Sequence, residues 1–131
     1  MFLILASAAQ NAMATDLTDT LLSGNLHLYS SATTSTAALN HNVAAGSVKE
    51  ILEVRVHLSA SVSSGTLATK IDAATGTYWD VVLDSGDLTS KTDYVFRPTR
   101  PIVLKATDAL NVSFDNPGAK TWGVEVIWRK P

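Results

Sequence analysis

A group of acidic residues in the middle of the chain has the composition of a possible metal site. Asp80, Asp84 and Asp87 surround a polar, turn-forming segment that also holds Ser85. Carboxylate and hydroxyl oxygens are ligands that Ca²⁺ prefers, so this group could hold a calcium ion. The EF-hand spacing is absent, however, and acidic residues in loops usually hydrogen-bond the backbone of their own turn. The sequence therefore favours an ordinary turn over a calcium site.

The histidines are the other candidate metal ligands. His27, His41 and His57 lie far apart, and they form none of the short-spaced pairs that are typical of metal sites. We therefore expect histidines at the surface or at an interface rather than metal ligands. The chain has no cysteine, which excludes disulfides, zinc–thiolate sites and thiol nucleophiles.

Motifs for nucleophilic or phosphate chemistry are also missing from the sequence. There is no Gly-x-Ser-x-Gly elbow, no P-loop and no GxGxxG, and no carboxylate spacing singles out an acid pair for glycoside hydrolysis. Arg97 and Arg100 stand beside rigid prolines and could bind an anion, but Asp93 and Asp108 are near in sequence, so surface ion pairing is favoured. We predict a protein that is not an enzyme and needs no cofactor or metal. A small hydrolase or isomerase with an unrecognised acid pair is the weaker alternative.

The elements that must position these side chains are predicted to be short β-strands. Over residues 52–58, Leu52, Val54, Val56 and Leu58 alternate with polar residues and share one face. Further strands are predicted at 67–71, 78–83, 94–97, 101–105, 110–114 and 122–129, with polar turns at 84–87 and 116–118 and one more possible strand at 25–29. About seven short strands without a usable amphipathic helix predict an all-β fold, an antiparallel β-sandwich of jelly-roll-like type.

The segment 122–129 is a long apolar strand with two tryptophans on one face, Trp122 and Trp128. A long apolar strand at the edge of a sheet promotes association, so this strand should be central in a sheet or paired across a subunit boundary. The tryptophans fit the core of the sandwich. They also fit an interface between subunits, where tryptophan is enriched.

The first third of the chain is almost without charge. Residues 1–48 contain Asp16, Asp19 and no Lys or Arg, whereas soluble surfaces normally carry interspersed charges of both signs. We therefore divide the chain into residues 1–45, an extended inter-subunit arm, and residues 46–131, the β-sandwich domain; a flexible tail is the alternative for the arm. A secretion signal is disfavoured because the apolar run at the start is short and no Lys or Arg precedes it.

Apolar side chains of the arm and of the last strand are the candidate interface residues. They are Phe2, Leu3, Ile4, Leu5, Leu21, Leu22, Trp122 and Trp128.

Net charge restricts the partners of this protein. Ten Lys and Arg against twelve Asp and Glu give a formal net charge of −2. This balance excludes a basic nucleic-acid binder and a polybasic protein of the membrane surface. No run of 18 apolar residues occurs that would predict a membrane-spanning helix. We therefore expect neither nucleic acid nor membrane as a partner.

The order of motifs in the second half resembles a family of viral proteins. The segments that carry the resemblance begin Tyr78-Trp79-Asp80-Val81 and Thr92-Asp93-Tyr94-Val95, and they continue through Arg100-Pro101-Ile102, Asp108-Ala109-Leu110 and Trp122-Gly123-Val124. Over residues 48–129 the chain is similar to small β-sandwich proteins encoded among the virion genes of tailed bacteriophages. The resemblance implies a decoration or cement protein on the capsid surface, commonly a homotrimer, whose partner is the major capsid protein. It implies no catalytic residues.

The alternative is a carbohydrate-binding or receptor-binding β-sandwich module of a phage tail or spike. In that case Trp79, Trp122 or Trp128 would stack on sugar rings. Exposed tryptophans would favour this function, and buried tryptophans would oppose it.

Overall fold

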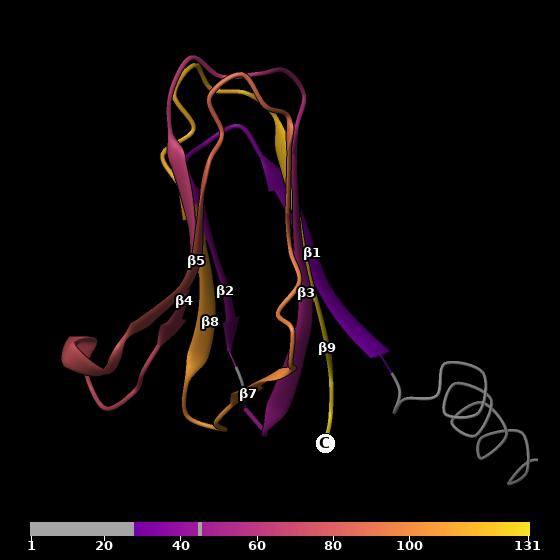
Figure 1. Cartoon of the computed structure of the whole chain (residues 1–131), viewed down its shortest axis with the longest axis vertical. Helices are drawn as coiled ribbons and strands as arrows, with labels where there is room; N and C mark the ends of the chain where they lie inside the picture. The colour runs from indigo at the N-terminus through magenta and orange to yellow at the C-terminus, as the bar shows by residue number, and fades with distance from the viewer. Residues whose placement is uncertain (1–27, 45) are drawn as a thin grey trace, which may run out of the picture.

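The computed structural model describes residues 28–44 and 46–131, which form two antiparallel β-sheets packed face to face (Figure 1). One sheet has the order β1 (Leu28–Ser35), β9 (Trp122–Arg129), β3 (Lys49–Leu58) and β6 (Asp93–Phe96), and β7 (Ile102–Leu104) also pairs with β3. The other has the order β2 (Leu39–Ala44), β8 (Ala109–Phe114), β4 (Thr66–Asp72) and β5 (Val81–Asp87). The predicted all-β antiparallel sandwich is confirmed. No helix within these described ranges has the length and apolarity needed to cross a bilayer.

The alternation of apolar and polar residues places the core between the two sheets. On β9, Trp122, Val124 and Val126 point inward and are at most 5% exposed. Facing them from the other sheet are buried residues such as Leu110 and Val112 of β8. Strand β9 pairs with β1 on one side and β3 on the other, so the long apolar strand is central, as predicted.

Strands β1 and β2 lie within the range that was predicted to be an extended arm. Both pair within the sandwich, β1 with β9 and β2 with β8. The sandwich therefore takes in residues 28–44 as well as the predicted domain. Leu39 and Val43 of β2 enter the core, so a segment without Lys or Arg is covered by its own subunit here. Residues 1–27 and 45 of the predicted arm lie outside the described residues.

Strand β3 differs from the predicted alternation at its first half. Val54, Val56 and Leu58 are buried as expected, but Ile51 and not Leu52 is the next buried residue. The register with β9 shifts between Ile51 and Glu53, which is a β-bulge. A bulge inserts one residue into the strand and so reverses the faces of all residues before it.

The segment 84–87, predicted as a polar turn, is the second half of strand β5. Asp84, Ser85 and Gly86 pair with β4 in register, and this pairing outweighs the turn preference of the individual residues. Gly86 is needed here because an added Cβ would lie 2.8 Å from the ring of Tyr94. The predicted strand at 78–83 is correspondingly shorter: Thr77–Trp79 forms the 3₁₀ turn η1, and β5 begins at Val81.

The predicted turn at 116–118 is confirmed, and Asn116 ties it to the connection between β1 and β2. Asn116 is 5% exposed and has a left-handed φ of 53°. Its amide Nδ2 donates to the carbonyls of Thr36 at 2.9 Å, Ala37 at 3.0 Å and Lys120 at 2.8 Å. The indole nitrogen of Trp122 donates to the same Ala37 carbonyl at 2.7 Å. Two loops far apart in sequence are therefore held together at one end of the sandwich.

Candidate functional site

The candidate interface residues predicted from the sequence fall into two groups. Phe2, Leu3, Ile4, Leu5, Leu21 and Leu22 lie outside the described residues. Trp122 is 5% exposed and belongs to the core, and Trp128 is partly buried and packs against it. The ammonium nitrogen of Lys49 lies 4.6 Å from the centroid of the Trp128 ring. Trp122 and Trp128 therefore contribute to packing, and the face of the Trp128 ring is covered by a cation.

The aspartates of the possible calcium site each have a separate partner. Asp80 accepts from the backbone of Ala73 at 2.9 Å, and Asp84 accepts from the hydroxyl of Tyr94 at 2.5 Å. Asp87 accepts from the backbone and the hydroxyl of Thr89. No group of three or more ligating side chains in residues 28–44 and 46–131 is arranged to hold a metal ion.

The histidines are also separate from one another. His41 is half-buried on β2, and burial lowers its pKa. His57 on β3 lies beside Asp93 on β6, with 2.7 Å between its Nδ1 and the carboxylate Oδ1. The hydrogen bonds from His57 and Thr92 lower the pKa of Asp93. His27 lies outside the described residues.

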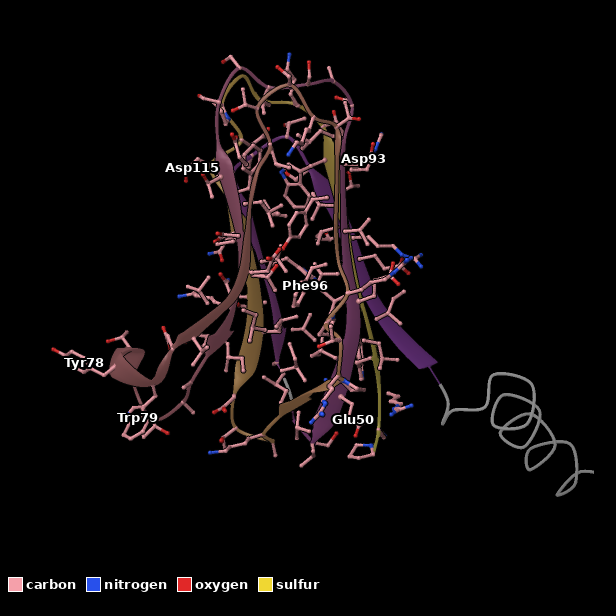
Figure 2. All side chains as sticks on the ribbon, in the orientation of Figure 1. Glu50, Tyr78, Trp79, Asp93, Phe96 and Asp115 are labelled. Atoms are coloured by element: carbon pink, nitrogen blue, oxygen red, sulfur yellow. The ribbon has the colours of Figure 1, made fainter. Side chains whose placement is uncertain are left out.

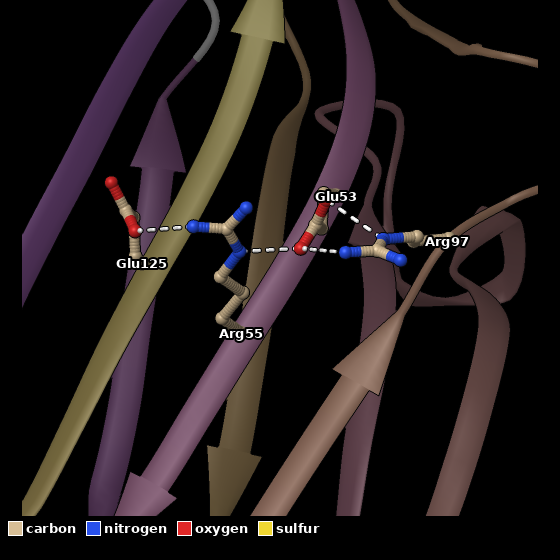
Figure 3. Close-up of polar contacts among 4 residues, drawn as sticks. All are labelled: Glu53, Arg55, Arg97 and Glu125. Atoms are coloured by element: carbon tan, nitrogen blue, oxygen red, sulfur yellow. Dashed lines mark hydrogen bonds and ion pairs between the residues drawn. The ribbon is translucent and has the colours of Figure 1, made fainter.

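A row of alternating charges crosses the outer face of the β1–β9–β3–β6 sheet (Figure 3). Glu53 accepts from Arg97 at 2.9 Å and also from the Nε of Arg55, and Arg55 lies 3.5 Å from Glu125. The hydrogen bonds from Arg97 and then Arg55 lower the pKa of Glu53 to about 2. Arg97 was predicted to form a surface ion pair, and it does so with Glu53 of the neighbouring strand.

Beside this charged row lies a hollow of about 720 Å³, centred on Gly123 of strand β9. Gly123 occupies an outward-facing position of β9 between Trp122 and Val124, whose side chains point inward. A Cβ added at Gly123 would meet no atom within 4 Å. The missing side chain in the middle of the sheet leaves the depression open. We call it the Gly123 hollow; around the glycine it is lined by Thr34, Arg55, His57, Asp93, Val95 and Glu125.

The most exposed apolar surface lies at the tip of the hairpin formed by β4 and β5. Tyr78 is 100% exposed and Trp79 67%, and Val81 and Val82 are 52% and 61% exposed. The hairpin projects away from the sandwich, and both aromatic side chains lie at its end (Figures 1 and 2). We call these four residues the hairpin tip.

The hairpin tip is held in shape by its own polar groups. Asp80 accepts from the backbone of Ala73 across the loop and lies 3.4 Å from the ammonium of Lys70. The amide of Trp79 donates to the carbonyl of Gly76 within the 3₁₀ turn. Because the loop is fixed on both sides, the aromatic rings are presented at low cost in conformational entropy.

Sequence reasoning named Trp79 as one of three possible sugar-stacking residues but placed it in a strand. Tyr78, Val81 and Val82 were not predicted as site residues. The run Ala73-Ala74-Thr75-Gly76-Thr77 before them is rich in small residues and ends one strand. A loop signal followed directly by two aromatic residues is the pattern that points to an exposed tip.

Comparisons with known proteins give a likeness of fold only. No protein-family model and no curated protein matches the chain. The crystal structure of PirA has a TM-score of 0.42 and 13% identity, with 79% of this chain and 92% of that chain covered. The structures of the infectious bursal disease virus Gx and Gt strains have TM-scores of 0.36 and 0.37 and identities of 19% and 16%. The chain matches about 30% of the length of each of these viral chains.

Proposed function

We propose that this chain is a non-catalytic structural subunit of a virion, which binds across capsid subunits as a homotrimer and stabilises the shell. The observation that carries the proposal is the hairpin tip, where Tyr78, Trp79, Val81 and Val82 are all more than half exposed. Exposed apolar side chains gathered at one projecting end, aromatic ones above all, are typical of surfaces that another copy or another protein covers. The motif resemblance to decoration proteins supports the capsid as the place of assembly.

The use of the charged side chains supports a structural function. Glu53 binds two arginines from its own and the neighbouring strand, Asp84 accepts from Tyr94, and Asp93 pairs with His57. The contacts of Glu53 and Asp93 join neighbouring strands of one sheet, and the Asp84–Tyr94 contact joins the two sheets. Such groups stabilise the sandwich, and the proposal assigns them no catalytic step.

The size of the tip explains why several copies would act together. An aromatic side chain buries about 150–250 Å², so Tyr78 and Trp79 could contribute about 8–12 kcal/mol of apolar burial at ~25 cal/mol per Å². Association costs about 4–15 kcal/mol in lost freedom of motion. One tip alone is therefore a marginal contact, and several such contacts within one closed assembly gain from their high effective concentration.

The experiment is co-sedimentation with shells assembled from the major capsid protein that is encoded with this chain. We expect the full chain to pellet with the shells at a fixed stoichiometry and to raise their unfolding temperature. A chain with Phe2, Leu3, Ile4 and Leu5 replaced by serine should bind less if residues 1–27 reach the shell. Val103→Ser is the control for the loss of an exposed apolar side chain, because Val103 is 58% exposed and lies away from the hairpin tip. Full-length chain that stays in the supernatant would overturn the proposal.

Carbohydrate binding is the second candidate, and the exposed ring of Trp79 favours it. Trp122 is buried and the Trp128 ring is covered by Lys49, so among the tryptophans Trp79 alone is more than half exposed. Iodide should quench the Trp79 emission first, and a bound sugar should protect it. Protection by sugars without any binding to shells would favour the second candidate over the first.

A further inference from the structure

The fold presents a projecting aromatic knob and, on its other sheet, an open depression. We propose that the hairpin tip of one copy packs into the Gly123 hollow of the next copy, head to tail. This inference rests on the proposed function, since it names the contact that would hold the trimer together. The occupant of the hollow is therefore a second copy of this chain.

The size of the hollow fits two aromatic side chains. Its volume of about 720 Å³ lies within the range of ~300–1,000 Å³ that is typical of pockets for drug-sized ligands. Its floor is the backbone of β9 at Gly123, where no side chain blocks a ring from lying flat on the sheet. Val95 on the rim is 53% exposed and supplies an apolar contact.

The polar groups of the hollow complement those of the tip. Trp79 and Tyr78 bring an indole N–H and a phenolic O–H as donors, and both side chains are exposed. The hollow brings the carboxylates of Asp93 and Glu125 as acceptors. The guanidinium of Arg55, which lies 3.5 Å from Glu125 and is half exposed, also lines the hollow, where it can lie over an aromatic face and form a cation–π contact.

The positions of the two surfaces prevent a copy from filling its own hollow. The tip ends a hairpin of the β2–β8–β4–β5 sheet, whereas the hollow lies on the outer face of the other sheet. Figure 2 shows Tyr78 and Trp79 on one side of the sandwich and Asp93 on the opposite side. The contact is therefore heterologous, and such contacts close into rings when the rotation between copies allows it. A ring of three satisfies every tip and every hollow.

Gly123 offers a substitution that fills the hollow without disturbing the strand. Its backbone is not in the left-handed region, and an added Cβ meets nothing within 4 Å, so Gly123→Val adds an outward β-branched residue that suits a strand. On the other surface, Trp79→Ser removes the larger ring of the tip. Val103→Ser is the control, since Val103 is also more than half exposed but belongs to neither surface.

The test is the molar mass of the full chain and of these variants by light scattering over a dilution series. We expect the wild type and Val103→Ser to be trimers, and Trp79→Ser and Gly123→Val each to weaken association by about 30-fold or more. Circular dichroism and melting temperature verify that each variant is folded. A wild type that stays monomeric overturns the inference, as does a folded Gly123→Val that associates as well as the wild type.

Mixing the two variants provides an independent test. Trp79→Ser keeps an intact hollow and Gly123→Val keeps an intact tip, so an equimolar mixture should form mixed dimers that neither variant forms alone, at a higher concentration than the wild-type trimer needs because only one contact holds them. Absence of mixed dimers from folded, monomeric variants overturns the head-to-tail contact. Shell binding is measured separately. A monomer that still decorates shells refutes this inference and leaves the shell-binding part of the proposed function standing, and a trimer that ignores shells does the reverse.

Discussion

Replacing Asn116 by alanine is expected to destabilise the sandwich by about 4 kcal/mol. The side chain is 5% exposed, and its amide contacts three carbonyls within 3.0 Å and accepts from the backbone of Lys120 at 3.2 Å. Two donor hydrogens and one acceptor are lost, at about 1 kcal/mol each. The left-handed φ of 53° adds about 1 kcal/mol, because alanine tolerates that region less well than asparagine.

Two further variants separate these contributions. Asn116→Gly loses the same hydrogen bonds but accepts the left-handed backbone, so it should cost about 3 kcal/mol. Asn116→Asp places a carboxylate against three carbonyl oxygens, which raises its pKa. That variant should therefore become more stable as the pH falls and the carboxyl gains a proton that it can donate.

The assay is urea unfolding at pH 7, followed by tryptophan fluorescence, to which Trp122 contributes; its indole donates to the same Ala37 carbonyl. A loss below about 1 kcal/mol for Asn116→Ala would refute the reasoning, because it would mean that water replaces the amide without cost. Equal losses for the alanine and glycine variants would refute the backbone part alone.

Three other perturbations have outcomes that the structure fixes. The pKa of Glu53 is lowered from 4.5 to about 2 in the folded state, so its ion pairs stabilise the fold above pH 4.5 and this stabilisation is lost as the pH falls towards 2. Glu53→Gln should therefore lower the free energy of unfolding, measured in urea, by about 1–2 kcal/mol at pH 7 and by little at pH 2. Burial and the Asp84 carboxylate raise the pKa of Tyr94, so stability should fall as the pH rises above 10 in the wild type and fall less steeply in Tyr94→Phe, as alkaline melting curves would record. Gly65→Ala places a Cβ 2.5 Å from the Phe114 ring, at a φ of +139°, so it should lower the free energy of unfolding by about 3 kcal/mol. Adding Phe114→Leu should restore part of this loss, as thermal unfolding would show.

The parts of the fold that could be predicted from the sequence are those where one face is buried along a whole strand. Trp122, Val124 and Val126 alternate with outward residues and are all buried, because β9 is paired on both sides without a register shift over these residues. The alternation failed at Ile51 and Leu52, since a bulge depends on the neighbouring strand and leaves no local signal.

The low charge of the first third of the chain predicted that this segment is covered, but not by what. Leu39 and Val43 lie in a segment without Lys or Arg because β2 is covered from within by the core. Low charge indicates that a segment is covered, but it does not tell whether its own subunit or another one covers it.

The candidate site depends most on tertiary structure. Trp79 is exposed because the β4–β5 hairpin extends beyond the opposite sheet; the loop signal before the two aromatic residues marks a tip, but it does not encode how far the hairpin projects. The Gly123 hollow likewise requires the side chains of four strands, and in the sequence Gly123 is one glycine between Trp122 and Val124.

The central position of β9 has a consequence for synthesis of the chain. On the ribosome, β1 and β3 emerge long before β9, and both lack their shared native partner until β9 is inserted between them. The nascent chain must therefore carry open strand edges for most of translation, in a topology whose distant pairings fold slowly. Chaperones that shield such edges, or a slower elongation rate, should raise the yield of native protein more than stabilisation of any single strand.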